Sequence, residues 1–260
     1  MTKVLDHGFI ELVGIMGDDY RVLQSARVST GGVASKGDAQ DKGLIRYLYK
    51  NGHVSPFDQV VMTWHVKAPI FVLRQWMRHW SWRFNEYSGR YSEMIEDMYV
   101  PETFKMQSPI NHQGSGEEFS DEDNSHYISE FQDIQGTYLA DYRSFLEKGM
   151  AKEQARMVLP VSQYSEMYGT VSLRDLFSFF EQRLDEHAQW EIRQYAGAML
   201  SILESRSELK WSIGTFNEFR ELKSIYNKCI NAAKKDTKQV KMTLQKLLSE
   251  LEQQNAEAYY

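Results

Sequence analysis

The sequence predicts an α+β fold: a mixed or antiparallel sheet flanked by helices, in a single domain whose second half is mostly helical. Two segments before residue 70 alternate apolar and polar residues with the period of a strand. After residue 125, apolar residues recur at helical spacing. A chain of 260 residues, 42% of them hydrophobic, is large enough to build one packed core.

The N-terminal elements follow from local patterns. Residues 9–16 are predicted to form a strand, and either Asp18 or Asp19 can cap a helix that runs to about residue 28. A second helix is expected over about 39–49. The chain should therefore enter its first strand early and then pass through two helices.

The next strand and helix lead into a charged segment. Residues 59–67 alternate cleanly, which predicts a half-buried strand. Pro69 can open a helix, because the first helical position needs no N–H. One side of that helix would carry Leu73, Trp76, Met77 and Trp80, and the other Arg74, Gln75, Arg78 and His79. The sequence thus predicts a continuous polar stripe.

The second half of the chain has the pattern of several helices. A long amphipathic helix is expected over about 128–145, and others from about residue 173 and over about 186–204. Polar and acidic residues predict a loop insertion near 106–125. We expect one domain over 1–205 with this insertion, and a helical C-terminal extension over 206–260. The extension ends in an apolar stripe of Val240, Leu244, Leu247, Leu248 and Leu251.

Charge and cysteine content exclude several classes of protein. A net charge of −6 argues against a general nucleic-acid binder, since such binding depends on Lys and Arg neutralising phosphates. Cys229 is the only cysteine, so no intrachain disulfide can form. The N-terminus lacks the apolar core of a signal peptide, and no stretch reaches the roughly 18 apolar residues of a membrane span. We therefore expect a cytoplasmic protein.

The run from Arg78 to Tyr91 is the best indication of function. It mixes arginines, a histidine and a glutamate with aromatic rings. From Lys67 to Arg90, five basic residues accompany one acid, which gives a local charge of +4. Arginine forks bind phosphate and flat rings bind heterocycles, so a nucleotide or flavin fits this run better than a solvated helix face does.

The stretch RHWSWRFNEYSGRYS is similar to the signature of the flavin-dependent thymidylate synthases, an arginine-histidine-arginine followed seven residues later by a serine. Ser88 occupies the serine position. The flanking segments GHVSPFD, APIFVLRQWMRH, ARMVLP and RLDEHAQWEIRQYA resemble the same family in the same order. Several separated blocks that agree are far more specific than one motif. The resemblance covers roughly residues 1–205.

The resemblance implies a site for deoxyuridine monophosphate (dUMP) and a site for FAD. The dUMP positions are Gln75, Arg78, Glu86, Tyr87, Ser88, Gly89, Arg90, Arg156 and Arg183. The FAD positions are His53, Ser55, Arg78, His79, Trp80, Glu86, Ser172, Leu173, Arg174 and Ser178. It also implies a homotetramer in which residues 86–90 reach a neighbour's nucleotide.

The implied reaction is the reductive methylation of dUMP to dTMP. Methylenetetrahydrofolate is the carbon donor, reduced FAD supplies the hydride, and NADPH reduces the flavin again. We assign Arg183 the catalytic task of stabilising negative charge on the N3 and O4 edge of uracil, since a guanidinium stays protonated. No protein nucleophile is required, which agrees with the ordinary setting of Cys229.

The chain departs from the family pattern at three positions. Trp80 replaces the second signature arginine, where it could stack on a flavin ring or, as the helical spacing favours, complete the apolar face of its helix. Ser172 and Ser178 stand where asparagines are commoner. Weaker flavin binding is expected. Arg174 and Ser178 share a helix face that Arg183 would not, unless the helix ends earlier.

Three alternative functions are less consistent with the sequence. A single-stranded nucleic-acid binder could use the aromatic and arginine run for stacking, but its charge is local. A variant acting on dCMP is disfavoured because Arg183 can only donate, whereas cytosine offers a donating amine. A metal site is disfavoured because His53, His65, His79 and Glu86 lack the usual ligand spacing.

Overall fold

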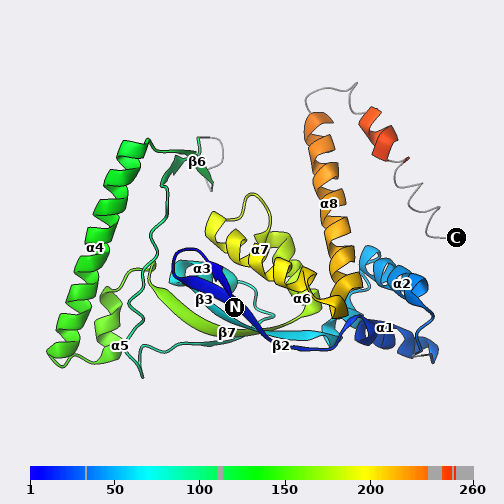
Figure 1. The fold of residues 1–260 in the computed structure, drawn as a ribbon, viewed down its shortest axis with the longest axis horizontal. Helices are drawn as coiled ribbons and strands as arrows, with labels where there is room; N and C mark the ends of the chain where they lie inside the picture. The colour runs from blue at the N-terminus through cyan, green and yellow to red at the C-terminus, as the bar shows by residue number, and fades with distance from the viewer. Residues whose placement is uncertain (33, 110–113, 234–241, 248, 250–260) are drawn as a thin grey trace. The chain divides into compact units, whose positions relative to one another are not determined.

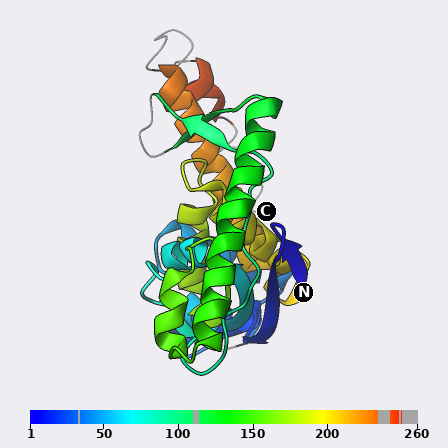
Figure 2. The same ribbon diagram turned by 90° about the vertical axis from the view of Figure 1, so that its left-hand side faces the viewer.

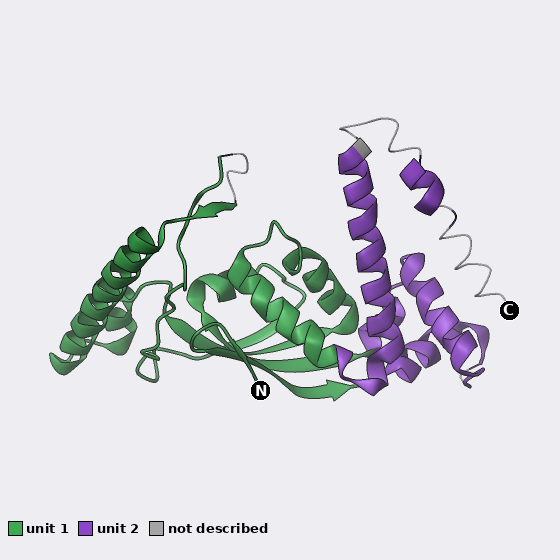
Figure 3. Cartoon of the chain, turned by 45° about the horizontal axis from the view of Figure 1, so that its top comes forward, with its two compact units in different colours: residues 1–16, 60–203 green, residues 17–59, 204–260 purple. Residues whose placement is uncertain are grey.

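The structure is a computed structural model that describes residues 1–32, 34–109, 114–233, 242–247 and 249. The predicted fold class, an α+β single domain with an antiparallel sheet flanked by helices, is confirmed. Within it, Figure 3 distinguishes two compact units. The sheet unit comprises residues 1–16 and 60–203, and the helical unit comprises the described residues of 17–59 and 204–260.

A five-stranded antiparallel sheet organises the sheet unit. Its order is β1 (Thr2–Val4), β2 (Gly8–Met16), β3 (Val61–Pro69), β7 (Tyr164–Ser172) and β4 (Arg83–Glu86). The strand predicted over 9–16 is confirmed as β2, and the strand predicted over 59–67 is confirmed as β3, two residues later. The sequence pattern had not indicated β7, because it is rich in polar residues although it lies between β3 and β4.

Three helices cover one face of this sheet: α3 (Ile70–Trp76), α6 (Leu173–Arg183) and α7 (Trp190–Glu204) (Figure 1). Met62, Trp64 and Val66 of β3 point into the core and are fully buried. The ring of Trp76 stacks on Phe179 at 4.9 Å, so α3 and α6 share an aromatic core. The two chain segments that carry Gln75 and Arg183 are held together by this core.

The helix that carries the signature ends earlier than predicted. α3 ends at Trp76, and successive turns follow in which His79 N donates to the Trp76 carbonyl and Trp82 N to the His79 carbonyl. Trp82 can therefore turn back and bury itself against Gly169 of β7. The predicted apolar stripe is wrong beyond Trp76, since Trp80 is 88% exposed. Trp80 does not complete a helix face, because the helix does not reach it.

The region predicted as a loop near 106–125 contains regular structure. Strands β5 (Lys105–Gln107) and β6 (Ser115–Glu118) pair with each other beside the start of α4 (Asp121–Glu147), as Figure 2 shows. Ser120 Oγ caps α4 by accepting from Asp123 N. The long helix therefore begins at Asp121, about seven residues before the predicted start at about residue 128. Residues 110–113 lie outside the described residues, and the insertion itself stays a prediction.

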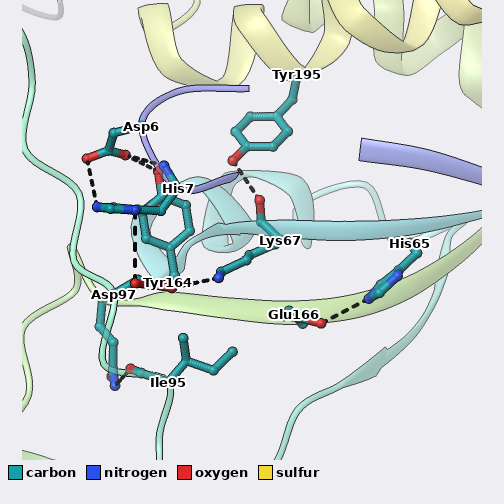
Figure 4. A network of polar contacts seen from close by, with 10 residues as sticks. Asp6, His7, His65, Lys67, Ile95, Asp97, Tyr164, Glu166 and Tyr195 are labelled. Carbon is teal, nitrogen blue, oxygen red and sulfur yellow. Dashed lines mark hydrogen bonds and ion pairs between the residues drawn. The ribbon is translucent and has the colours of Figure 1, made fainter. Parts of the chain in front are cut away.

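A polar network anchors the segment around Asp97, which follows the loop between residues 86 and 95 (Figure 4). Asp6, in the β1–β2 turn, accepts from Tyr164 Oη at 2.5 Å and from Val100 N at 3.1 Å. Lys67 Nζ lies 2.6 Å from Asp97 Oδ2. At one end of the loop between residues 86 and 95, β4 pairs with β7. Just beyond the other end, Asp97 pairs with Lys67 of β3, so both ends of the loop are held on the sheet.

The helical unit contains α1 (Asp19–Arg27), α2 (Asp38–Lys50) and α8 (Lys210–Ala233). Asp18 caps α1 through Arg21 N, which confirms one of the two predicted caps. Asp19 instead accepts from Trp211 N and Ser212 N at the start of α8. The division at residue 205 stays a prediction, and Val240, Leu248 and Leu251 of the apolar stripe lie outside the described residues. No helix in the described part of the chain combines the length and apolarity of a membrane span.

Candidate active site

Arg183 lies at the C-terminal end of α6, where two acceptors hold its side chain. Its Nε donates to His79 Nε2 at 2.9 Å, and its Nη2 donates to the Gln75 carbonyl at 3.1 Å. The Gln75 carbonyl belongs to the last turn of α3, whose C-terminal carbonyls carry partial negative charge. We call Gln75, Arg78, His79 and Arg183 the guanidinium cluster.

The charge of Arg183 has no carboxylate partner among the described residues. Burial lowers its pKa, and both of its acceptors are neutral. Burial and, to a smaller extent, the neighbouring Arg183 charge lower the pKa of His79 to about 4. His79 is therefore neutral at pH 7, and its Nε2 accepts the hydrogen bond from Arg183. The cluster presents a partly buried cation that can serve an electron-rich ligand.

Gln75 contacts this cation from α3, and Arg78 follows two residues after the end of α3. The Gln75 amide donates to Gln189 Oε1 at 2.5 Å, which connects α3 to the loop before α7. Arg78 is exposed and forms no ion pair within the described part of the chain. Sequence reasoning missed Gln189, although it stands inside the family-like block RLDEHAQWEIRQYA. Two of the predicted dUMP positions, Gln75 and Arg183, thus meet at neighbouring ends of two helices.

Residues 86–90 lie beside the short helix that precedes Arg156. A Cβ atom on Gly89 would stand 3.0 Å from Cδ of Arg156, so a side chain there would require Arg156 to shift. Arg90 Nε donates to Glu153 Oε2 at 3.0 Å. Glu86 accepts from Ser165 Oγ at 2.8 Å at the end of β4. We call residues 86–90 with Glu153 and Arg156 the loop cluster; Glu153 is a second residue that the sequence had not singled out.

Turn geometry shapes the middle of the loop cluster. The Ser88 carbonyl accepts from both Tyr91 N and Ser92 N at 3.2 Å, and Ser88 Oγ accepts from Arg90 N. Tyr87 N donates to the Glu166 carbonyl, which extends the β4–β7 pairing by one residue. These bonds fix the backbone, while the side chains of Glu86, Tyr87 and Arg90 remain exposed. The loop is thus a rigid support for outward-facing polar groups.

Four further predicted flavin positions, Ser172, Leu173, Arg174 and Ser178, belong to α6 or to its N-cap. Ser172 caps the helix by accepting from Asp175 N at 3.3 Å, and Arg174 Nε lies 3.3 Å from Asp175 Oδ1. Leu173 is fully buried, so only its backbone could meet a ligand. Ser178 accepts from Gln182 at 3.4 Å. Because α6 continues unbroken to Arg183, Arg174 and Ser178 lie on a different face from Arg183.

His53 and Ser55 belong to the helical unit. His53 N donates to the Leu48 carbonyl at the end of α2, and its ring meets Tyr47 edge-on at 5.9 Å. Gly52 allows the chain to turn back at the end of α2, because it adopts a φ of +69°. Their contact with flavin stays a prediction. Among the described residues, no group of three or more His, Cys, Asp or Glu side chains is placed to hold a metal ion.

Comparison with known proteins places the chain in a family. The family model described as thymidylate synthase complementing protein matches residues 11–207. A flavin-dependent thymidylate synthase of Thermus thermophilus is 47% identical over 209 residues, 80% of this chain and 76% of the relative. The chain belongs to the flavin-dependent thymidylate synthase family. Another from Treponema denticola is 47% identical over 210 residues, 80% of this chain and 79% of the relative.

The chain is also similar to a solved structure of a nucleotide methylase. The UMP/dUMP methylase PolB from Streptomyces cacaoi, bound with 5-Br dUMP, superposes with a TM-score of 0.75 at 32% identity. The match covers 83% of this chain and 97% of PolB. The family resemblance predicted from the signature is therefore confirmed, and the predicted blocks all lie inside the matched residues.

Proposed function

We propose that this chain catalyses the reductive methylation of dUMP to dTMP in the cytoplasm. The proposed co-substrates are methylenetetrahydrofolate and NADPH, and the proposed cofactor is FAD. The observation that carries the proposal is the state of Arg183: a partly buried guanidinium held by two neutral acceptors, with no carboxylate partner in the described part of the chain. The similarity to flavin-dependent thymidylate synthases and to a UMP/dUMP methylase supports it.

Arg183 would act on the pyrimidine. C5 of uracil becomes nucleophilic toward the methylene carbon as negative charge accumulates on the N3 and O4 edge. A guanidinium stabilises that charge without giving up its proton. Two of its five N–H groups are used by His79 and the Gln75 carbonyl, so three remain for the nucleotide.

The loop cluster would bind the remainder of the nucleotide. Arg90 and Arg156 supply cations suited to a phosphate, and the absence of a side chain at Gly89 lets Arg156 pack directly against the loop. The family resemblance supports a shared site in a homotetramer, in which residues 86–90 of one subunit contact the nucleotide bound at the guanidinium cluster of a neighbour.

The donor set also fits FAD. Arg78 and Arg174 are exposed guanidinium groups that suit a pyrophosphate, and the 88% exposed indole of Trp80 can stack on a flat ring. When bound, FAD supplies hydride transfer, chemistry that no side chain provides. The protein groups bind and orient the two aromatic ligands.

The deciding experiment is a visible spectrum of the purified protein with FAD, followed by anaerobic NADPH and a turnover assay with dUMP and methylenetetrahydrofolate. We expect bleaching of the flavin and formation of dTMP, with UMP and dCMP as comparison substrates. R183A should reduce turnover by about a hundredfold or more while FAD stays bound. R143A, which removes a surface guanidinium paired with Glu96, is the matched control. Absence of dTMP with FAD bound and reducible would overturn the proposal.

A further inference from the structure

We infer that His79 is a positioning residue for Arg183: its imidazole Nε2 holds the guanidinium by accepting from Arg183 Nε, and so orients the remaining N–H groups toward the pyrimidine. The inference rests on the proposed function, because it assumes that Arg183 faces the nucleotide. It adds a role for His79 that is separate from any contact of this residue with flavin.

Arg183 depends on its acceptors for orientation. It is the last residue of α6, where the helix gives little lateral support to a long side chain. Its Nε and Nη2 lie on the same edge of the guanidinium, and this edge makes the bonds to His79 and to the Gln75 carbonyl. The opposite end of the group is left for a ligand. Loss of either hydrogen bond would allow the guanidinium to rotate about the hydrogen bond that remains.

The His79 ring is itself firmly placed. Only 8% of the residue is exposed, and the ring meets Phe179 edge-on at 4.9 Å. Its backbone N and O both take part in the turns that follow α3. Phe179 lies one turn before Arg183 on the same helix, so ring and guanidinium are fixed relative to each other through α6. A rigid acceptor of this kind fixes the position of the side chain that donates to it.

A neutral acceptor suits the task better than a carboxylate. A carboxylate at this position would neutralise much of the charge that the reaction needs from Arg183. Burial and the Arg183 charge hold the pKa of His79 at about 4, so the imidazole stays neutral and keeps its Nε2 lone pair at pH 7. The ring proton must then be on Nδ1, which remains a donor for another group. The two ring nitrogens thus have separate roles that can be tested separately.

Glutamine and asparagine distinguish the two nitrogens. A glutamine at position 79 places an acceptor oxygen where Nε2 was, whereas an asparagine places its amide near Nδ1. We expect H79Q to keep the rate of dUMP methylation at saturating FAD within about threefold of wild type. H79N should lose about tenfold to a hundredfold in kcat, the scale of a misplaced reacting group. FAD and dUMP dissociation constants, with thermal unfolding as a check of folding, show whether binding or stability explains the loss.

Equal rates for H79Q and H79N, or a loss in H79N that disappears when FAD is raised, would overturn the inference. Histidine 15N NMR provides a readout without turnover. In the wild-type protein at pH 7, Nε2 of His79 should be unprotonated and hydrogen-bonded, and R183A should remove the hydrogen-bond shift. A protonated Nε2 would also overturn it. If the wild-type protein makes no dTMP, the proposed function fails, while the NMR result still decides whether His79 accepts from Arg183.

Discussion

Gly89 lies directly against Arg156. A Cβ atom added to Gly89 would stand 3.0 Å from Cδ of Arg156 and 2.1 Å from Sδ of Met94. The contact with Arg156 joins residues 86–90 to a residue that lies more than sixty positions later in the sequence. The glycine therefore sets where the Arg156 guanidinium can lie.

Replacing Gly89 with alanine should weaken nucleotide binding. The new methyl group must push Met94 and Arg156 aside, so we expect G89A to raise the dissociation constant of dUMP by about tenfold, the cost of roughly one charge-assisted hydrogen bond. Calorimetric titration with dUMP checks this. G136A is the control, because a Cβ there meets nothing within 4 Å in α4. An unchanged dUMP affinity in G89A would show that Arg156 is not needed at the phosphate.

Trp80 should be replaceable without loss of stability. Its side chain is 88% exposed beyond the end of α3, so W80A and W80R should shift the free energy of unfolding by less than about 0.5 kcal/mol. W80R restores the signature arginine and should lower the FAD dissociation constant by about tenfold through a charge-assisted contact. Flavin fluorescence quenching measures the affinity. Tighter FAD binding by the tryptophan form than by W80R would instead indicate a stacking role.

Asp19 should contribute more to stability than its neighbour Asp18. Asp19 is 3% exposed and accepts from Trp211 N at 2.7 Å and from Ser212 N at 3.0 Å. D19A would leave two buried donors at the start of α8 without this acceptor, at a cost of about 2 kcal/mol or more. D18A removes an exposed cap of α1 and should cost about 1 kcal/mol. Urea unfolding of both variants checks the order, which equal losses would contradict.

Stability should fall in acid partly through His79. Its pKa is about 4 in the folded chain against 6.5 for an ordinary histidine, so the unfolded chain binds more protons between these values. The contribution is complete above about pH 6.5 and is lost as the pH falls toward 4, by up to about 3 kcal/mol. Urea unfolding from about pH 7.5 to about pH 4.5 measures it across this window. H79Q should lose less stability over this range; a parallel decline in both proteins would contradict the assignment.

Much of the fold and the family could be predicted from local signals. β2 and β3 follow from alternation, α2 from its apolar spacing, and the cap of α1 from Asp18. These features depend on neighbours within a few residues, which the sequence displays directly. The signature at residues 78–88 likewise carries its chemistry in contiguous residue types, so the family and the candidate cations were predictable.

Only the tertiary structure decided where α3 ends and what Arg183 touches. The helical spacing continues through Trp80, yet the chain leaves the helix at Trp76, because burying Trp82 on Gly169 and pairing β4 with β7 stabilise the turn. That turn places His79 against Arg183, more than a hundred residues away in sequence. Contacts at such separation depend on the packing of the whole sheet unit. The sequence thus determined which groups are available, and the packing determined which of them meet.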